Sequence, residues 1–371
     1  MKSNWKEERL GSLVRFSSGG TPNKNNPSYW NGTIPWISAK NMKSEVIETS
    51  DLSITEEGLI HGSKIAPKGS LLLLVRGSGL FNGIPVCYLE NAVAYNQDVK
   101  CIESTSELEN KYLFYWLKAN SGYLRKKIEF TSIGAGKFDT RFLSNLVVRF
   151  PDKVTRKKII DIADNISDRI NINRKINENL AQQAQAIYAD IFITNADPAW
   201  PLGHLSDLIT VRYGKDHKKL DDGPFPVYGS GGVMRYVERP IYEKESVLIP
   251  RKGTLNNVMY VNEPFWSVDT MFFTEMKLPD VAKFVFHFVK SKDLASLNAG
   301  SAVPSMTTDI LNAMELCIPD PETLKCFESI VGPMYRTMQH NTEESKELAT
   351  VRDTLLPRLM SGELDVSKLD L

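Results

Sequence analysis

The sequence predicts an α+β protein in which two similar globular parts alternate with two long helices. Two stretches of helical periodicity, residues 155–193 and 322–360, each follow a strand-like run that ends in Pro-Asp, at Asp152 and at Asp320. Short β-branched and aromatic runs, broken by Gly, Pro and Asn, fill the chain before each helix, which is typical of small mixed sheets. A chain of 371 residues is long enough for two or three domains.

The two globular parts repeat each other loosely. Residues 69–79 read "GSLLLLVRGSG" and residues 245–254 read "ESVLIPRKGT", while a W-x4-L pattern begins at Trp5 and again at Trp200. The interval between matching positions is longer at these two tryptophans than at the two Pro-Asp runs, so loops differ in length between the two parts. Each part is expected to hold one further helix, at 110–127 and at 281–298. The predicted domains are 1–152, 153–196 (long helix), 197–320 and 321–371 (long helix and tail).

Both long helices have a recognisable beginning. Asp320, Pro321 and Glu322 form a good helix start, with Asp as the N-cap and Pro at the first helical position, and Asp152 occupies the matching place in the first half. At ~1.5 Å per residue, helices of this length reach nearly 60 Å. They are therefore predicted to act as a spacer and not as core elements.

Every seventh residue of the two helices forms a heptad seam with a polar break at its centre. The seam consists of Ile159, Ile166, Asn173, Leu180 and Ile187 in the first helix and of Phe327, Met334, Asn341, Leu348 and Leu355 in the second. An antiparallel coiled coil places Asn173 beside Asn341, with Ile166 against Leu348 and Leu180 against Met334. A buried Asn pair costs stability but fixes register and orientation. The alternative is two independent amphipathic helices, each packed on its own domain.

Composition and charge indicate a soluble cytoplasmic protein. No apolar run approaches the ~20 residues that span a bilayer, and the N-terminus has no apolar signal-peptide region. The four cysteines form no CxxC pair, so neither a zinc site nor a disulfide framework is expected. The net charge is zero, but residues 1–193 carry +6 and residues 194–371 carry −6. Neither half is basic enough to bind DNA strongly through phosphates alone, so DNA binding would need local basic patches or a partner that supplies more contacts.

Catalytic motifs are incomplete. The loop at 16–30, "FSSGGTPNKNNPSYW", resembles an amino-methyltransferase motif, but "NPSY" lacks the second proline and no room remains for a Rossmann-like unit. The sequence contains neither HExxH nor GxSxG. We therefore expect no catalytic centre and no cofactor in this chain.

Four stretches resemble the specificity subunits of type I restriction-modification systems. They are "SGGTPNKNNPSYWNGTIPWISAKNM", the segment "VRGSG…NQDVKCI" at 75–102, "NRKINENLAQQAQAIYADIFI" and "RDTLLPRLMSGELDVS". Together with the internal repeat they cover nearly the whole chain.

The resemblance implies a division of labour within a complex. Each globular part would be a target recognition domain that reads one half of a bipartite double-stranded DNA target. The coiled coil would set the length of the unread spacer. Two modification subunits, which carry S-adenosylmethionine, would dock on the chain, and restriction subunits that translocate DNA could join them. No membrane partner is implied.

Candidate DNA-contacting residues are polar side chains in loops. In the first domain they are Lys24, Asn25, Lys40, Asn41, Arg76, Ser78 and Lys137. In the second domain they are Lys215, His217, Lys218, Lys219, Tyr228, Ser230, Arg251, Lys252 and Ser305. Arg76 and Arg251 each follow an apolar strand and precede a Gly-containing turn, and Arg can bond guanine bidentately. The alternative for these two is an ion pair with a nearby carboxylate, such as Asp98 or Asp269.

Other functions remain open at this point. The chain could be a protein-interaction scaffold, an inactive relic of the specificity family or, with less support, a self-contained DNA methyltransferase. A DNA reader should lose affinity steeply as salt rises, whereas a protein scaffold should not.

Overall fold

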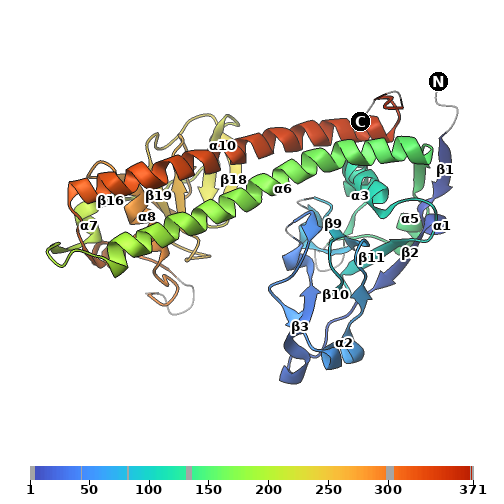
Figure 1. The fold of residues 1–371 in the computed structure, drawn as a ribbon, viewed down its shortest axis with the longest axis horizontal. Helices are drawn as coiled ribbons and strands as arrows, with labels where there is room; N and C mark the ends of the chain where they lie inside the picture. The colour runs from blue at the N-terminus through green and yellow to red at the C-terminus, as the bar shows by residue number, and fades with distance from the viewer. Residues whose placement is uncertain are drawn as a thin grey trace. The chain divides into compact units, whose positions relative to one another are not determined.

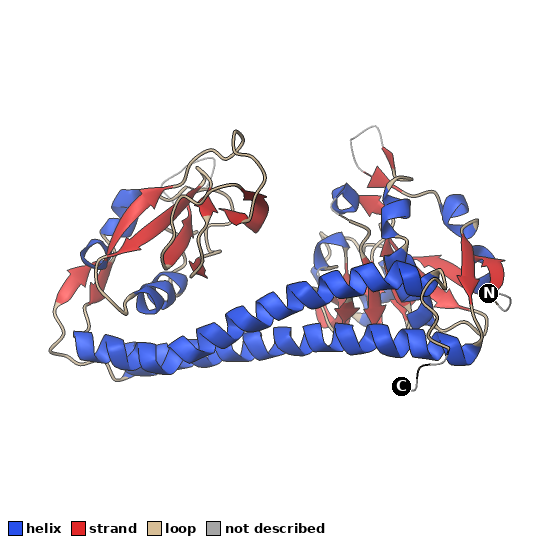
Figure 2. Cartoon of the chain, turned by 90° about the horizontal axis from the view of Figure 1, so that it is seen from above, coloured by secondary structure: helices blue, strands red, loops and turns tan. Residues whose placement is uncertain are grey.

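The computed structural model describes residues 5–42, 44–81, 83–130, 136–297, 305–367 and 369. The chain forms two compact units. Unit 1 comprises Met1–Ile172 and Glu343–Leu371, and unit 2 comprises Asn173–Thr342. Each unit contains a segment of both long helices, α6 (Lys153–Ala189) and α10 (Pro321–Met360), which lie side by side (Figure 1). Figure 2 shows that strands and short helices make up the rest of each unit.

Unit 1 is built from small sheets, the largest with the strand order β2-β11-β7-β9-β4. The strands are β1 (Lys6–Arg9), β2 (Val14–Ser18), β3 (Trp30–Ile37), β4 (Val46–Ile47), β5 (Ser53–Ile54), β6 (Ile65–Ala66), β7 (Leu71–Leu74), β8 (Arg76–Gly77), β9 (Val86–Leu89), β10 (Val93–Tyr95), β11 (Val99–Ser104), β12 (Glu129–Phe130), β13 (Gly136–Lys137) and β14 (Val147–Phe150). The helices are α1 (Leu10–Leu13), α2 (Glu56–Gly62), α3 (Asn110–Ala119), α4 (Ser121–Arg125) and α5 (Thr140–Ser144), with 3-10 turns η1 (Pro27–Tyr29), η2 (Ala39–Asn41) and η3 (Ser78–Phe81).

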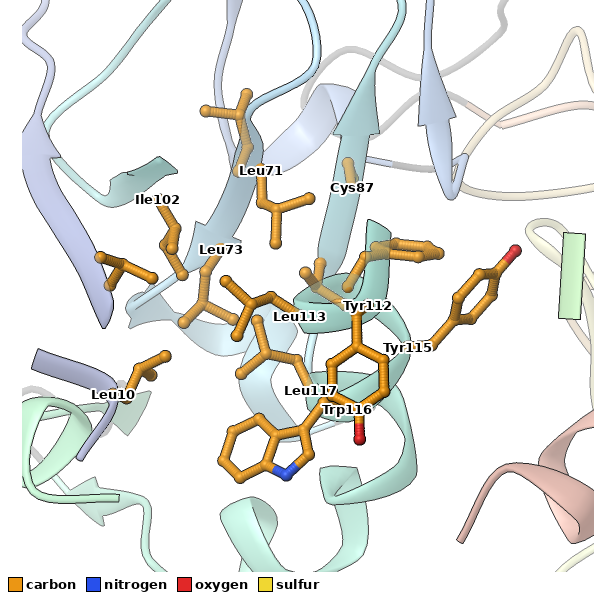
Figure 3. Packing of buried hydrophobic residues seen from close by; sticks show 14 of the residues in the cluster. Leu10, Leu71, Leu73, Cys87, Ile102, Tyr112, Leu113, Tyr115, Trp116 and Leu117 are labelled. Atoms are coloured by element: carbon orange, nitrogen blue, oxygen red, sulfur yellow. The ribbon is translucent and has the colours of Figure 1, made fainter. Parts of the chain in front are cut away.

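The core of unit 1 explains why β7 is apolar at every position. All four of its leucines are fully buried, so both faces of this central strand are covered. Helix α3 packs on the sheet through buried side chains that include Tyr112, Leu113 and Trp116 (Figure 3). Sequence patterning predicted both this strand and this helix.

Unit 2 has the same kind of build, with a central sheet in the order β16-β22-β19-β20. The strands are β15 (Leu202–His204), β16 (Ile209–Tyr213), β17 (Phe225–Gly229), β18 (Gly232–Val237), β19 (Ser246–Pro250), β20 (Met259–Val261), β21 (Trp266–Ser267), β22 (Met271–Met276) and β23 (Glu315–Cys317). The helices are α7 (Leu205–Leu208), α8 (Ala282–Lys290) and α9 (Thr308–Asn312), and a π-helical turn, Asp190–Thr194, follows α6.

The internal repeat is a structural repeat. The antiparallel pairs β1·β14 and β2·β11·β7 in unit 1 correspond to β15·β23 and β16·β22·β19 in unit 2, and the parallel pair β3·β10 corresponds to β17·β21. In the first pairs, Arg9 lies opposite Val147 and His204 lies opposite Glu315. The sequence interval from Arg9 to His204 is longer than that from Val147 to Glu315, which is the difference seen in the sequence. It is therefore a change in loop length between equivalent strands.

Both long helices begin where the Pro-Asp signals predict. The Asp152 carboxylate accepts hydrogen bonds from the backbone N–H of Thr155 (3.1 Å) and from its hydroxyl (2.8 Å), and Asp320 does the same with Thr323 (2.9 and 2.8 Å). These bonds to backbone and hydroxyl donors lower the pKa of Asp320 to about 2. Each carboxylate thus satisfies N–H groups at the first turn that have no helical partner.

The two helices are antiparallel in each unit. In unit 1, Arg169 bonds Glu344 at 3.2 Å. In unit 2, the Asn173 side chain donates to the carbonyl of Asn341 at 3.4 Å, and that of Asn341 donates to Asn177 at 2.9 Å. Asn173 and Asn341 are 1% and 6% exposed, so the polar pair lies inside the seam. Ile166, Leu180, Met334 and Leu348 are all half-buried, and their pairwise contacts remain predictions.

We expect the double substitution Asn173→Leu with Asn341→Leu to stabilise the helix pair by about 1 kcal/mol or more, because well-packed apolar groups usually replace buried polar ones without loss. Thermal unfolding followed by circular dichroism measures the change. Asn165→Leu, at an exposed position of α6, serves as the control. If the double variant melted at a lower temperature than the parent, the proposal that the buried Asn173–Asn341 pair fixes the register of α6 and α10 at a cost in stability would be wrong.

None of the helices in the described part of the chain is long and apolar enough to cross a membrane. Among the described residues, no three or more His, Cys, Asp or Glu side chains lie together in a group that could hold a metal ion.

Candidate nucleic-acid interface

The ends of several strands of unit 1 are hydrogen-bonded to one turn, Asn96–Asp98. The N–H of Asn96 donates to the last residue of β3, Ile37 (2.9 Å), and the carbonyl of Asp98 accepts from Val75, just after β7 (2.9 Å). The segment that follows β2 joins the same place, because Gly20 donates to the carbonyl of Tyr95 at 2.9 Å. The Thr21 hydroxyl also donates to the side chain of Gln97 at 2.8 Å. We call this region the unit 1 edge: residues 19–26, 38–41, 76–78, 96–98 and 137.

Unit 2 repeats this arrangement bond for bond. Val268 donates to the carbonyl of Tyr228 (3.1 Å), and Arg251 donates to that of Thr270 (2.9 Å). The loop after β16 is held where Lys215 donates to the carbonyl of Ser267 at 2.8 Å. We call this region the unit 2 edge: residues 214–219, 230, 251–253, 268–270 and 305.

Nearly all candidates in the first domain reach solvent at the unit 1 edge. Lys24, Asn25, Lys40, Arg76 and Ser78 are exposed, and Lys137 is half-buried opposite Arg76 in the β8·β13 pair. Asn41 has a structural task, because its side-chain oxygen accepts hydrogen bonds from the Ser38 hydroxyl (2.7 Å) and backbone (3.3 Å). These bonds hold the η2 turn that presents Lys40.

The candidates of the second domain also gather at one edge, with one exception. Lys215, Lys218, Lys219 and Lys252 are exposed, whereas His217, Ser230, Arg251 and Ser305 are half-buried. Ser305 forms a bridge with Lys252, and Ser230 lies beside Gly253.

Tyr228 is that exception. Its hydroxyl donates to the Glu263 carboxylate at 2.8 Å, and its ring packs edge-on against Phe265. Burial and this carboxylate both raise the pKa of Tyr228. The side chain is thus engaged in internal packing, which the sequence could not indicate because the partner lies 35 residues away.

His217 also differs from the expectation of an exposed basic side chain. It is half-buried, and its Nδ1 atom is enclosed without a hydrogen-bond partner in the described part of the chain. The loop backbone turns at this point, since Leu220 donates to the His217 carbonyl at 3.2 Å.

The structure corrects the pairing of Arg76 with Arg251. Arg76 donates its N–H to Asp98 (3.2 Å), and the equivalent bond in unit 2, to Thr270 (3.2 Å), comes from Lys252. Arg251 is the counterpart of Val75. Its guanidinium stacks over the ring of Tyr213 at 5.3 Å and reaches the Asp269 carbonyl, not its carboxylate, at 3.5 Å.

Two further residues, one in the unit 1 edge and one next to the unit 2 edge, were not among the candidates from the sequence. Gln97 ties the loop after β2 to the central turn through Thr21, and the half-exposed ring of Tyr213 carries Arg251. Their only signal was position, since each follows or ends a strand whose neighbours were candidates.

An ionic cluster joins the segment after the η2 turn to α3 and α10. Glu45, shortly after the η2 turn, binds Arg352 of α10 at 2.7 Å and also contacts Lys118 of α3. Arg352 is only 5% exposed, and burial lowers the pKa of Lys118 despite the nearby carboxylate. A cavity of about 420 Å³ opens beside this cluster. The segment after the η2 turn is therefore anchored to α10, within unit 1, by the ion pair between Glu45 and Arg352.

Each edge presents cationic, amide and hydroxyl groups on loops held by backbone hydrogen bonds. Such groups suit the phosphates and base edges of a nucleic acid, since lysine and arginine neutralise phosphates and side-chain donors read bases in a groove.

Comparisons with known proteins agree with this chemistry. A family model described as "Type I restriction modification DNA specificity domain" matches residues 2–182 and 199–349. The MjaIX specificity subunit of Methanocaldococcus jannaschii is 22% identical, over 99% of this chain and 95% of that protein. The HindI specificity subunit of Haemophilus influenzae is 21% identical, over 98% and 100%.

A shorter match and a solved structure complete the comparison. A type I specificity subunit of Escherichia coli is 28% identical over 201 residues, and this match spans 49% of that protein, about half of its length. The crystal structure of a type I S subunit from M. genitalium superposes with a TM-score of 0.54 at 19% identity, covering 96% of each chain. This likeness supports the fold.

Proposed function

The chain belongs to the type I restriction-modification specificity family, and from this premise we propose that its two edges each read one half of a bipartite DNA target. As a specificity subunit, the chain is the non-catalytic, DNA-recognising component of its complex. The observation that carries the proposal is the repetition of the edge, with the same backbone bonds in both units. Two equivalent readers in one chain suit two half-sites on one duplex.

The modification subunits are proposed to dock on the long helices and to supply S-adenosylmethionine and the methyl transfer. Large apolar side chains that α6 and α10 leave exposed favour a protein partner there. They are Val154, Ile172, Ile176, Ile330 and Val351, which are 39–66% exposed. Restriction subunits would join this assembly, and the cytoplasm, where the DNA lies, is the proposed location. With partner subunits adding phosphate contacts, a net charge of zero is compatible with binding DNA.

The test is a methylation map. The chain is expressed with its modification subunit in a host that lacks DNA methylation, and N6-methyladenine is located by single-molecule sequencing. We expect a split motif with a fixed unread gap, and exchange of residues 197–320 for those of a relative should change one half only. A stable complex of the two proteins that leaves the DNA unmodified would instead favour a scaffold or an inactive relic, and weak salt dependence of DNA binding would support that reading.

A further inference from the structure

We propose that Arg76 reads a guanine in the half-site of unit 1, whereas Lys252, at the equivalent position of unit 2, makes a phosphate contact that does not select a base. This inference rests on the proposed DNA-reading function and assigns different chemistry to its two readers. It concerns equivalent positions, because Arg76 and Lys252 donate to the same turn and lie opposite Lys137 and Ser305. These two opposite residues are separated by the same sequence interval as the helix caps Asp152 and Asp320.

Arg76 is an uncommitted arginine. Its side chain is exposed and has no hydrogen bond, ion pair or ring contact among the described residues. The other arginines of this globular part are mostly held in place by partners: Arg9 by Asn145, Arg15 by Glu103, Arg125 by the Phe81 carbonyl and Arg149 by Glu7. A guanidinium without an internal partner keeps all five donors for a ligand.

The one other exposed arginine there without such a partner in the described part of the chain, Arg141, lies elsewhere in the fold. It belongs to α5, which packs on α1 at the start of β2, whereas the edge lies at the end of β2. Position therefore distinguishes Arg76 from Arg141, although their exposure is similar.

The backbone at Arg76 allows a duplex to come close. Gly77 has a φ of +133°, and a Cβ placed there would have no atom within 4 Å, so the space beside the backbone that follows Arg76 is open. Lys137, across the β8·β13 pair, adds a second positive charge. A guanidinium placed in a groove can bond O6 and N7 of guanine together, which no other base permits.

Unit 2 offers a different group at this place. The arginine of unit 2, Arg251, lies one residue earlier in the chain. Because successive side chains of a strand point to opposite faces, Arg251 does not take the place of Arg76, and its guanidinium lies over the ring of Tyr213. Lys252, exposed and followed by Gly253 with a φ of +87°, is the residue presented at the edge. An ammonium is a point charge without the planar fork of arginine, so it suits a phosphate.

The experiment uses the complex with the modification subunit and DNA in which both half-sites are randomised. Base preferences of methylation are compared for the parent, Arg76→Ala, Arg76→Lys, Lys252→Ala and Arg141→Ala. We expect both Arg76 variants to lose preference for guanine at one position of one half-site by about 5- to 150-fold, the range of one bidentate contact. Lys252→Ala should lower methylation equally for all sequences and reduce the salt dependence by about one counterion.

The outcomes separate this inference from the proposed function. Parent protein that yields no split motif overturns both. A parent with a split motif, combined with Arg76 variants that keep every base preference, overturns the inference alone, as does relaxation in the half-site governed by residues 197–320. Arg76 and Arg141 are both exposed, so Arg141→Ala with parental preferences and parental methylation shows that loss of a surface arginine alone has no effect.

Discussion

Replacing Lys283 with alanine is expected to destabilise unit 2 by about 3–5 kcal/mol, the usual cost of removing one member of a buried ion pair. Lys283 is 4% exposed, and its ammonium binds Glu245 and Glu328, each at 2.9 Å. It also lies 5.0 Å above the ring of Tyr260, whose hydroxyl bonds the Glu245 carboxylate. Without the cation, two carboxylates face each other in a poorly hydrated site, and repulsion adds to the lost hydrogen bonds.

Native-state hydrogen exchange, read by mass spectrometry on peptides of α8, measures this loss locally, while α3 peptides of unit 1 provide an internal reference. Lys325→Met, at an exposed position of α10 in unit 2, is the control and should change stability by less than ~0.5 kcal/mol. Lys283→Met keeps the apolar stem and should lose nearly as much as alanine, because charge and not packing dominates. Equal protection in Lys283→Met and the parent would show that the cluster does not need its cation.

The contacts of Lys283 belong to the part of the fold that could not be predicted from the sequence. The long helices were predictable because their signals are local: an Asp N-cap, and a seven-residue repeat with Asn173 and Asn341 at its centre. The helix at α8 was predictable too, but its sequence does not indicate which side chains surround Lys283 and His287, because those partners lie on distant segments. In the structure, Lys283 and His287 are buried against α6 and α10, through contacts with Gln185, Glu328 and Tyr335.

The candidate site shows the same limit. Loops that follow apolar strands were expected to hold the Lys and Arg candidates, and most of these side chains are exposed in the structure. The equivalence of Arg76 with Lys252 is defined by a backbone hydrogen bond to a turn from another part of the sequence. The sequence prediction paired Arg76 with Arg251 instead, because both are arginines and Arg251 lies next to Lys252. The internal bond of Tyr228 could not be predicted for a related reason, since its partner Glu263 belongs to a distant loop.

Acidification should destabilise unit 2 through His287. Burial, with a smaller contribution from Lys290, lowers the pKa of His287 to about 4, against ~6.5 in an unfolded chain. As pH falls from 6.5 to 4, the unfolded chain binds a proton that the folded one does not, so folding loses free energy, in total roughly 3 kcal/mol. The geometry agrees, because Nδ1 lies 2.8 Å from the side-chain oxygen of Gln185 and Nε2 lies 3.0 Å from the Tyr335 hydroxyl. Protonation would turn Nε2 from an acceptor into a donor, so the Tyr335 hydroxyl would lose its acceptor.

Urea unfolding at a series of pH values, followed by a hydrogen-exchange pulse at one fixed labelling pH, gives the stability of unit 2 from its α8 peptides. The parent should weaken steadily below pH 6.5, since stability rises with pH wherever the unfolded chain binds more protons. His287→Gln removes the titrating group and should remove most of this slope. His340→Gln, at an exposed position of α10, should keep the parental slope. If His287→Gln also kept it, the acid sensitivity of unit 2 would not arise from His287.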